Sequence, residues 1–123
     1  MPSLNRLKRI ADRIKQDLAV MLIKGEIKDP RLKNIYITGV NIDRELAFAN
    51  VFVSAIEGNQ RAPEILEGLK HASGFLRSKL ADNIQLHSFP HLRFHWDPTP
   101  ERAERIEKLI DIIHKERNDE GDR

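Results

Sequence analysis

The chain has 123 residues, of which 40% are hydrophobic and 33% are charged, a composition typical of one soluble globular domain and not of a disordered chain. It contains no cysteine, which excludes disulfides, thiolate metal sites and cysteine nucleophiles and suits the reducing cytoplasm. The net charge is only +2 and no apolar run approaches the ~20 residues of a membrane-spanning helix, so we expect a cytoplasmic protein with no membrane partner.

Positive charge is unevenly distributed along the chain. Residues 1–33 carry nine Lys or Arg residues against four Asp or Glu residues. A second basic region covers residues 70–95, where Asp82 is the only carboxylate. Its lysines and arginines are Lys70, Arg77, Lys79 and Arg93. Both regions are candidates for a surface that binds the phosphates of a nucleic acid, although an ordinary solvated face would carry the same residue types.

A long amphipathic helix is predicted near the N-terminus, with Ser3 as its N-cap and Gly25 as its C-terminal stop. Its apolar stripe consists of Leu4, Leu7, Ile10, Ala11, Ile14, Leu18, Met21 and Leu22. At about 100° per residue, basic side chains cluster on the side away from this stripe. We call these residues the basic ridge: Arg6, Lys8, Arg9 and Arg13. The ridge could contact phosphates or simply keep the helix soluble.

Two strands are predicted to follow this helix. Asp29-Pro30-Arg31 ends the helical pattern, because proline disfavours helical geometry in the residue before it. Residues 35–42 and 47–56 are rich in β-branched and aromatic residues and lie close in sequence, which favours an antiparallel hairpin. The alternation in the first strand changes phase, so we expect a β-bulge near Thr38-Gly39.

Residues 63–81 predict two helices that bury the same face. Their shared stripe consists of Ile65, Leu66, Leu69, Ala72, Ser73, Leu76 and Leu80. Gly74 interrupts this pattern, and glycine costs a helix interior about 1 kcal/mol relative to alanine. We therefore expect the chain to change direction at Ala72-Ser73-Gly74, forming a kink between the two helices. The basic side chains of this segment lie off the stripe and remain available to a polyanion.

The last part of the chain predicts a third strand and a final helix. Leu92, Phe94 and Trp96 alternate with polar residues, which is a strand signature. Asp97-Pro98 stops that strand, and Thr99 can cap the helix that follows. The apolar stripe of this helix, which we expect to be buried, consists of Ala103, Ile106, Leu109, Ile110 and Ile113.

The predicted order is helix, strand, strand, helix, kink, helix, strand, helix. This order indicates an α+β domain in which a three-stranded sheet packs on helices. We expect one domain over residues 1–117 and a flexible tail over residues 118–123.

Patterns of catalytic and metal-binding residues are missing, so we expect no enzymatic activity, cofactor or metal. His87, His91 and His95 are spaced by four, which on a helix would align three imidazoles for zinc. Pro90 and the strand pattern argue against a helix here. Carboxylates of the final helix each have a basic residue one turn away, which favours surface ion pairs over an acid/base pair.

The aromatic residues have two interpretations. Phe48, Phe52, Phe89, Phe94 and Trp96 could stack RNA bases, as on the sheet of an RRM. The order of elements does not fit that module, and aromatic residues at strand period are more often part of a core. We favour the core interpretation.

The arrangement of a helix, two strands, a helix pair and a third strand resembles a type II KH domain. The GxxG loop with which KH domains clamp phosphates is missing, and Ala72-Ser73-Gly74 stands in its place. With this replacement, the chain from about residue 4 to residue 115 closely resembles the ribosome-binding factor A family. The other segments that carry the resemblance are Asp29-Pro30-Arg31-Leu32, AFANVFVS at residues 47–54, GFLR at residues 74–77, and FPHLRF at residues 89–94 followed by Asp97.

The resemblance implies a factor that binds free, immature small ribosomal subunits and assists late maturation and processing of their ribosomal RNA, near its 5′-terminal helix. It implies binding without turnover, and we expect a monomer when the chain is free. The residues expected to contact phosphate are the basic ridge, Lys70, Arg77, Lys79 and Arg93. The alternative is a protein-interaction module that docks through a sheet edge or the final amphipathic helix.

Overall fold

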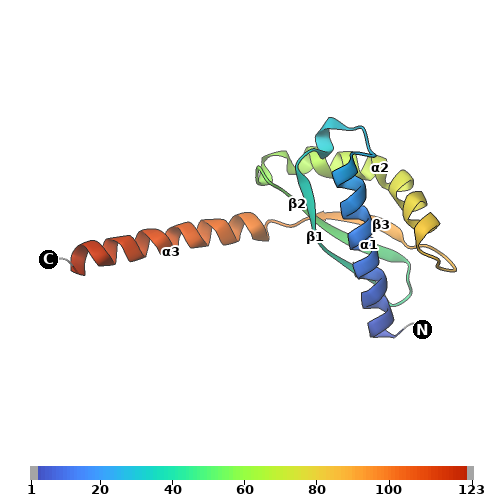
Figure 1. Ribbon diagram of the computed structural model, residues 1–123, viewed down its shortest axis with the longest axis horizontal. Coiled ribbons are helices and arrows are strands. Elements are labelled where there is room, and N and C mark those ends of the chain that lie inside the picture. Colours follow the sequence, from blue (N-terminus) through green and yellow to red (C-terminus); the bar gives the residue numbers. More distant parts are fainter. Residues whose placement is uncertain (1–2, 122–123) are drawn as a thin grey trace.

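The computed structural model describes residues 3–121, which form three α-helices, two short 3-10 helices and three strands (Figure 1). In chain order they are α1 (Leu4–Lys24), η1 (Pro30–Leu32), β1 (Ile35–Ile42), β2 (Phe48–Ala55), η2 (Asn59–Arg61), α2 (Ala62–Asn83), β3 (His91–Trp96) and α3 (Thr99–Gly121). No helix within this described range is long and apolar enough to cross a bilayer. The predicted α+β class and three-stranded sheet are confirmed.

The first helix, α1, begins and ends where its capping residues predict. The hydroxyl of Ser3 accepts a hydrogen bond from the backbone N–H of Arg6 (3.2 Å), which satisfies a donor of the first turn. Gly25 adopts the left-handed conformation at φ 65°, and its N–H donates to the carbonyl of Leu22 (3.3 Å), a cap that glycine adopts at little cost. The predicted stripe is buried at Leu7, Ile10, Ala11, Ile14, Leu18 and Met21. Leu4 is exposed and Leu22 is half-buried.

The sheet has the strand order β1-β2-β3, with β1 antiparallel and β3 parallel to β2. The register between β1 and β2 shifts between Ile37 and Gly39, which confirms the predicted hairpin and bulge. The carboxylate of Asp43 closes the hairpin turn, because it accepts a hydrogen bond from the backbone N–H of Phe48 (2.8 Å). Within the described sheet β3 pairs only with β2, so the outer edge of β3 is open.

One face of the sheet packs against α1 and α2, and the core lies between these layers. The inward residues of β2 are Ala49, Val51, Val53 and Ala55, and all are buried. They share one core with Ile14 and Leu18 of α1 and with Ile65, Leu69, Leu76 and Leu80 of α2. Burying a large aliphatic side chain contributes about 1.5–3 kcal/mol. The opposite face of the sheet carries exposed residues of β3.

The short helix η1 packs on α2 at a position where α2 has no side chain. Asp29 caps η1, since its carboxylate accepts hydrogen bonds from the backbone N–H of Arg31 (3.0 Å) and from the guanidinium of Arg31 (2.8 Å). A Cβ at Gly68 would lie 3.1 Å from Cδ2 of Leu32 and 3.3 Å from Oδ2 of Asp29. Gly68 therefore allows the segment Asp29-Pro30-Arg31-Leu32 to approach the helix.

The element α2 is one helix and not the predicted pair. It continues from Ala62 to Asn83 through Ala72-Ser73-Gly74, so the prediction of two separate helices is wrong. The predicted stripe is buried at Ile65, Leu69, Leu76 and Leu80 and half-buried at Leu66, Ala72 and Ser73. A single glycine lowers helix propensity by about 1 kcal/mol, which the burial of this stripe outweighs.

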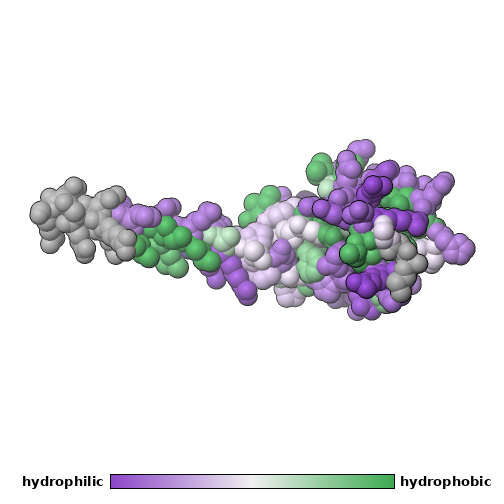
Figure 2. Space-filling model, turned by 90° about the horizontal axis from the view of Figure 1, so that it is seen from below, coloured by the Kyte–Doolittle hydropathy of each residue, from purple (hydrophilic) through white to green (hydrophobic). Residues whose placement is uncertain are grey.

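The last helix, α3, projects away from the domain (Figure 1). The prediction that its apolar stripe is buried is wrong. Ile106, Leu109, Ile110 and Ile113 are between 46% and 59% exposed, and Ala103 is exposed. In Figure 2 a hydrophobic patch lies on part of this protruding helix. An amphipathic pattern indicates that a helix has a partner, but it does not place the partner in the same chain.

The first turn of α3 is tied to the rest of the domain. Thr99 is the first residue of α3 and not the predicted cap. The carboxylate of Asp97 accepts a hydrogen bond from the backbone N–H of Thr99 (2.9 Å), which satisfies a donor of the first turn. Glu101 accepts a hydrogen bond from the N–H of Asn59 (2.8 Å). The side chain of Asn59 in turn accepts one from the indole N–H of Trp96 (2.7 Å).

The predicted boundary at residue 118 falls inside α3, which continues to Gly121. Residues 122–123 of the predicted tail lie outside the described residues. The division into residues 1–117 and 118–123 therefore remains a prediction.

Candidate nucleic-acid interface

The eight basic residues expected to contact phosphate lie on three elements. They are Arg6, Lys8, Arg9 and Arg13 on α1, Lys70, Arg77 and Lys79 on α2, and Arg93 on β3. Seven of them are exposed, and Arg77 is half-buried. The structure brings Lys70 and Arg93 to one groove and leaves the basic ridge on a separate helix.

The basic ridge presents its charge on the solvent-facing side of α1. Among the residues that the structure describes, no carboxylate lies within ion-pair distance of Arg6, Lys8 or Arg9. Arg13 differs, since its Nε lies 3.2 Å from Oδ1 of Asp17. An exposed pair one helical turn apart is worth only about 0.3–0.5 kcal/mol, so Arg13 can exchange Asp17 for a phosphate at small cost.

A groove of about 550 Å³ runs between α2 and the open edge of β3. Its lining includes Leu66, Lys70 and Ser73 from α2 and Leu92, Arg93 and Phe94 from β3. The apolar members of this set are half-buried, whereas Lys70 and Arg93 are exposed. Glu67, one carboxylate, also lines the groove and is exposed. The groove therefore combines an apolar lining with two cations and one carboxylate at its border.

Backbone groups of β3 face into the same groove. The N–H groups of His91 and Asp97 donate to carbonyls of residues 47 and 53, at 2.9 and 2.8 Å. In a parallel pair every second residue bonds to the neighbouring strand, so Leu92 and Phe94 direct their N–H and C=O groups to the open side. An unpaired base or an extended peptide could bond to these groups.

Arg77 has a structural contact that the sequence did not indicate. Its Nη2 donates to the carbonyl of Phe89 (2.7 Å) and its Nε donates to the carbonyl of Pro90 (3.3 Å). Both carbonyls belong to the loop between α2 and β3, and Phe89 and Pro90 are buried. Arg77 thus holds this loop against α2, and its contact with RNA remains a prediction.

Gly74 leaves an open stretch of backbone near this groove. It is exposed, and a Cβ at this position would meet no atom within 4 Å among those considered. Packing within the described chain therefore does not require glycine here. Ser73, the residue before it, lines the groove, and the Ser73 hydroxyl donates to the carbonyl of Lys70 (2.8 Å), a contact that often bends a helix.

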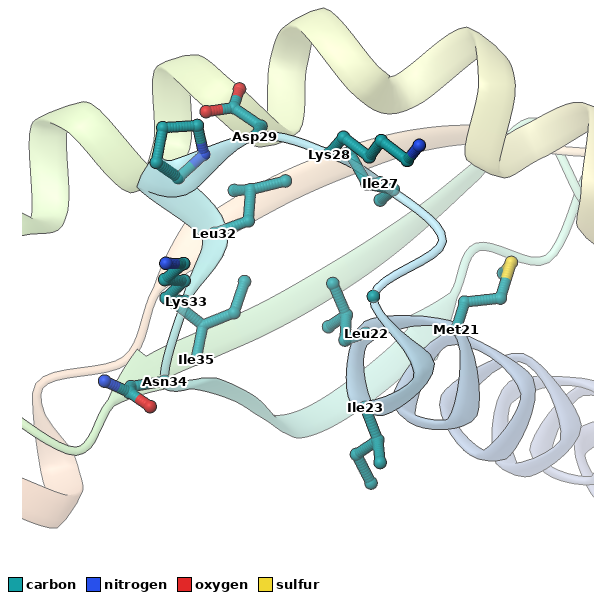
Figure 3. A pocket seen from close by; sticks show the side chains of 12 residues that line it. Met21, Leu22, Ile23, Ile27, Lys28, Asp29, Leu32, Lys33, Asn34 and Ile35 are labelled. Carbon is teal, nitrogen blue, oxygen red and sulfur yellow. The ribbon is translucent and has the colours of Figure 1, made fainter.

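A larger hollow, of about 660 Å³, lies between the end of α1, η1 and the start of β1 (Figure 3). Its lining includes Leu22 and Ile35, and its only carboxylate is that of Asp29. The side-chain hydrogen bond from Arg31, followed by the bond from the Arg31 backbone, lowers the pKa of Asp29 below its ordinary value. A single carboxylate held ionised in this way does not form an acid/base pair.

The histidines of the described structure do not converge on one point. His91 and His95 lie on β3 and His87 lies in the loop before it. Four residues of strand span about 13 Å, which is too far for two imidazoles to share a metal ion. Among the side chains that the structure describes, no group of three His, Asp or Glu residues could hold a metal ion.

The five aromatic residues considered for stacking divide between the two faces of the sheet. Phe89 is buried, and Phe94 and Trp96 pack against the core. Phe48 and Phe52 alternate with the buried residues of β2, so they lie on the opposite face. The core interpretation therefore holds for Phe89, Phe94 and Trp96 and not for Phe48 and Phe52. Alternation along a strand does not tell which face of the sheet the helices cover.

Comparisons with known proteins agree with this architecture. The family model for ribosome-binding factor A matches residues 6–110. The chain is 44% identical over 107 residues to the ribosome-binding factor A of Nitrosomonas europaea, covering 87% of this chain and 91% of that one. The crystal structure of ribosome-binding factor A from Thermus thermophilus matches with a TM-score of 0.64 at 24% identity, covering 72% of this chain and 93% of that chain.

A further match is a homology model of the Thermus thermophilus factor, fitted into a cryo-electron-microscopy map of its 30S complex. The TM-score is 0.50 at 24% identity, covering 67% of this chain and 89% of that chain. These structures share the fold. The family model and the 44% identity over most of both chains show that this chain belongs to the ribosome-binding factor A family.

Proposed function

We propose that this chain binds the RNA of free, immature small ribosomal subunits and assists late maturation and processing of that RNA, near its 5′-terminal helix, without catalytic turnover. The observation that carries the proposal is the groove between α2 and the open edge of β3, bordered by Lys70 and Arg93. Cations attract phosphates. Unpaired RNA bases stack on apolar side chains and form hydrogen bonds with free backbone groups. The Thermus thermophilus factor of the same family, fitted into a map of a 30S complex, supports this partner.

The basic ridge belongs to the proposed interface. Its exposed cations supply attraction that is independent of sequence, and the shape of the groove supplies selectivity. Each phosphate contact that is lost weakens binding and reduces its salt dependence.

Co-sedimentation with purified free small subunits tests the ridge. Reversing Arg9 and Arg13 to glutamate should weaken binding without lowering the melting temperature, because both side chains are exposed. Reversing Arg102 and Lys115, which are exposed on α3, makes the same change in net charge and should leave binding near the wild-type level. Wild-type binding by the Arg9 and Arg13 variant would remove the ridge from the interface.

We further propose that Ala72-Ser73-Gly74 forms a kink within the continuous helix α2, in place of a GxxG loop. The bond from the Ser73 hydroxyl to the carbonyl of Lys70 supports a bend. The course of α2 in Figure 1, whose second half slopes downward from the first, also supports it. A bend here would present the backbone of Gly74 to a phosphate.

The substitution Gly74→Ala separates this role from helix stability. Alanine should raise helix stability by about 1 kcal/mol, since there is open space at this position. If the kink takes part in RNA recognition, the same variant binds small subunits less tightly. Binding equal to that of the wild type would contradict the proposed role of the kink.

A second candidate function, docking of another protein, is favoured by α3. Its exposed apolar residues are Ile106, Leu109, Ile110, Ile112 and Ile113. Salt distinguishes the two functions, because screening weakens phosphate contacts and leaves apolar contacts largely intact. Binding to small subunits that survives high salt and is lost on Ile106→Ser/Ile110→Ser substitution would favour protein docking.

A further inference from the structure

The face of the sheet turned away from α1 and α2 carries two stacked pairs of side chains. The guanidinium carbon of Arg93 lies 3.3 Å from the ring centroid of Phe48. The imidazole centroid of His95 lies 5.2 Å from that of Phe52, with an angle of 28° between the rings. In each pair the phenylalanine is half-buried and the residue of β3 is exposed. The outer surface therefore consists of flat polar groups that cover the phenylalanine rings.

The imidazole of His95 is held in place by a hydrogen bond before any partner binds, and the guanidinium of Arg93 lies against the ring of Phe48. His95 and Arg93 are two residues apart on one strand, or about 6.6 Å. Nε2 of His95 lies 2.9 Å from Oδ1 of Asn50, and the amide nitrogen of Asn50 donates to Oδ1 of Asn41 (3.0 Å). Because an amide oxygen only accepts, this bond requires a proton on Nε2 of His95. Such preorganisation reduces the entropy lost on binding.

The chemistry of this face matches a single-stranded nucleic acid. Among the residues of β1, β2 and β3, all of which the structure describes, none is acidic. The open face includes Asn41, Asn50, His91, Arg93 and His95. Bases stack on aromatic rings and on guanidinium planes and form hydrogen bonds with amides. The rings of Phe48 and Phe52 are half-buried beneath these polar groups, and Tyr36 is the exposed large apolar residue of the three strands.

The open face is also continuous with the groove. Arg93 and His95 both border the groove between α2 and β3, while their side chains stack on the open face. A strand of RNA that lies in the groove can therefore pass over the edge of β3 and reach the stacked pairs.

We propose that this open sheet face binds unpaired RNA bases, one stacked on the guanidinium of Arg93 and one on the imidazole of His95. The proposal rests on the proposed function, in that the partner is RNA. It goes beyond that function because it assigns base stacking, and not only phosphate attraction, to Arg93 and adds His95 to the interface.

The test measures binding of the full chain to two probes by fluorescence anisotropy. One is a ten-nucleotide oligoadenylate, and the other is an abasic RNA of the same length, with the same phosphates and no bases. Arg93→Lys keeps the charge and loses the guanidinium plane. We expect it to bind oligoadenylate about fivefold to tenfold more weakly than the wild type, and to bind the abasic probe equally well.

Variants of the second pair provide an independent comparison. His95→Ala should weaken binding to oligoadenylate by a similar factor. His95→Phe, which restores a flat ring, should recover most of the lost affinity. Gln85→Ala is the control variant, because Gln85 is an exposed loop residue outside the stacked pairs. It should bind oligoadenylate as the wild type does. Thermal unfolding shows that each variant is folded before its binding is compared.

The possible results separate the inference from the function on which it rests. Equal affinity of the wild type for both probes, or wild-type affinity of Arg93→Lys and His95→Ala for oligoadenylate, would overturn base stacking at this face. Wild-type protein that binds neither probe but stays with small subunits at high salt would assign the face to a protein and overturn it as well. Failure of the wild type to co-sediment with small subunits would instead refute the proposed function.

Discussion

Nη2 of Arg77 donates a 2.7 Å hydrogen bond to the carbonyl of Phe89, and this bond ties the loop before β3 to α2. Arg77→Ala leaves two carbonyls of this loop without their donor. We expect the free energy of unfolding to fall by about 1–3 kcal/mol. Lys79→Ala, at an exposed position of the same helix, should change it by less than about 0.5 kcal/mol.

Urea unfolding measures both variants. If Arg77→Ala proves as stable as the wild type but binds small subunits poorly, Arg77 contacts phosphate and its bond to the loop contributes little.

Two glycines of α2 should respond in opposite ways to alanine. At Gly68 a Cβ would lie 3.1 Å from Leu32 and 3.3 Å from Asp29, and Asp29 is fixed by its bonds to Arg31. At Gly74 a Cβ would meet open space. We expect Gly74→Ala to be more stable than Gly68→Ala by about 1–3 kcal/mol, because both variants gain the helix preference for alanine and only Gly68→Ala is opposed by crowding.

Thermal and urea unfolding of the two variants, side by side, provide the comparison. Equal stabilities would show that η1 moves freely enough to accept a methyl group at residue 68.

The hairpin turn should be sensitive to acid. The hydrogen bond from the N–H of Phe48 lowers the pKa of Asp43 below its ordinary value. The unfolded chain therefore binds this proton more tightly than the folded chain does. The resulting stabilisation is present above the unfolded pKa, about 3.9, and is lost as the pH falls through the lower folded pKa.

Asp43→Asn removes this titration. We expect the variant to melt below the wild type at pH 7, and the difference in melting temperature to shrink as the pH is lowered below about 4. A difference that is the same at pH 7 and pH 3 would mean that the charge of Asp43 does not stabilise the turn.

Exposure of α3 predicts that its apolar residues contribute little to stability. Ile110 is 46% exposed, whereas Leu69 in the core is 1% exposed. Ile110→Ser should change the free energy of unfolding by less than about 0.5 kcal/mol, and Leu69→Ala should lower it by about 2–5 kcal/mol. Comparable losses in the two variants would place Ile110 in a packed interface. A melting temperature that rises with protein concentration would identify that interface as one between copies of the chain.

Elements with local determinants could be predicted from the sequence. The limits of α1 follow from Ser3 and Gly25, which cap the helix through bonds to residues at most four positions away. The bulge follows from a change of alternation within one strand, near Thr38-Gly39. These features need no knowledge of distant parts of the chain.

Features that depend on distant partners could not be predicted in the same way. The stripe of α3 has helical periodicity, but nothing in the sequence tells whether another element covers it. Gly74 suggested a break in the helix, whereas Gly68, which was not singled out, is the glycine that close packing requires. Arg77 lies off the apolar stripe, as an RNA contact would, and only the folded loop reveals the carbonyls that it bonds to.

Affinity for purified free small ribosomal subunits, measured over a range of salt concentrations, tests RNA binding by this chain most directly. We expect the logarithm of the association constant to fall steeply and linearly with the logarithm of the salt concentration. Lys70→Glu, in the groove beside β3, should weaken binding and reduce the slope by about one phosphate contact. An affinity that does not depend on salt, or a slope that Lys70→Glu leaves unchanged, would contradict binding of RNA in this groove.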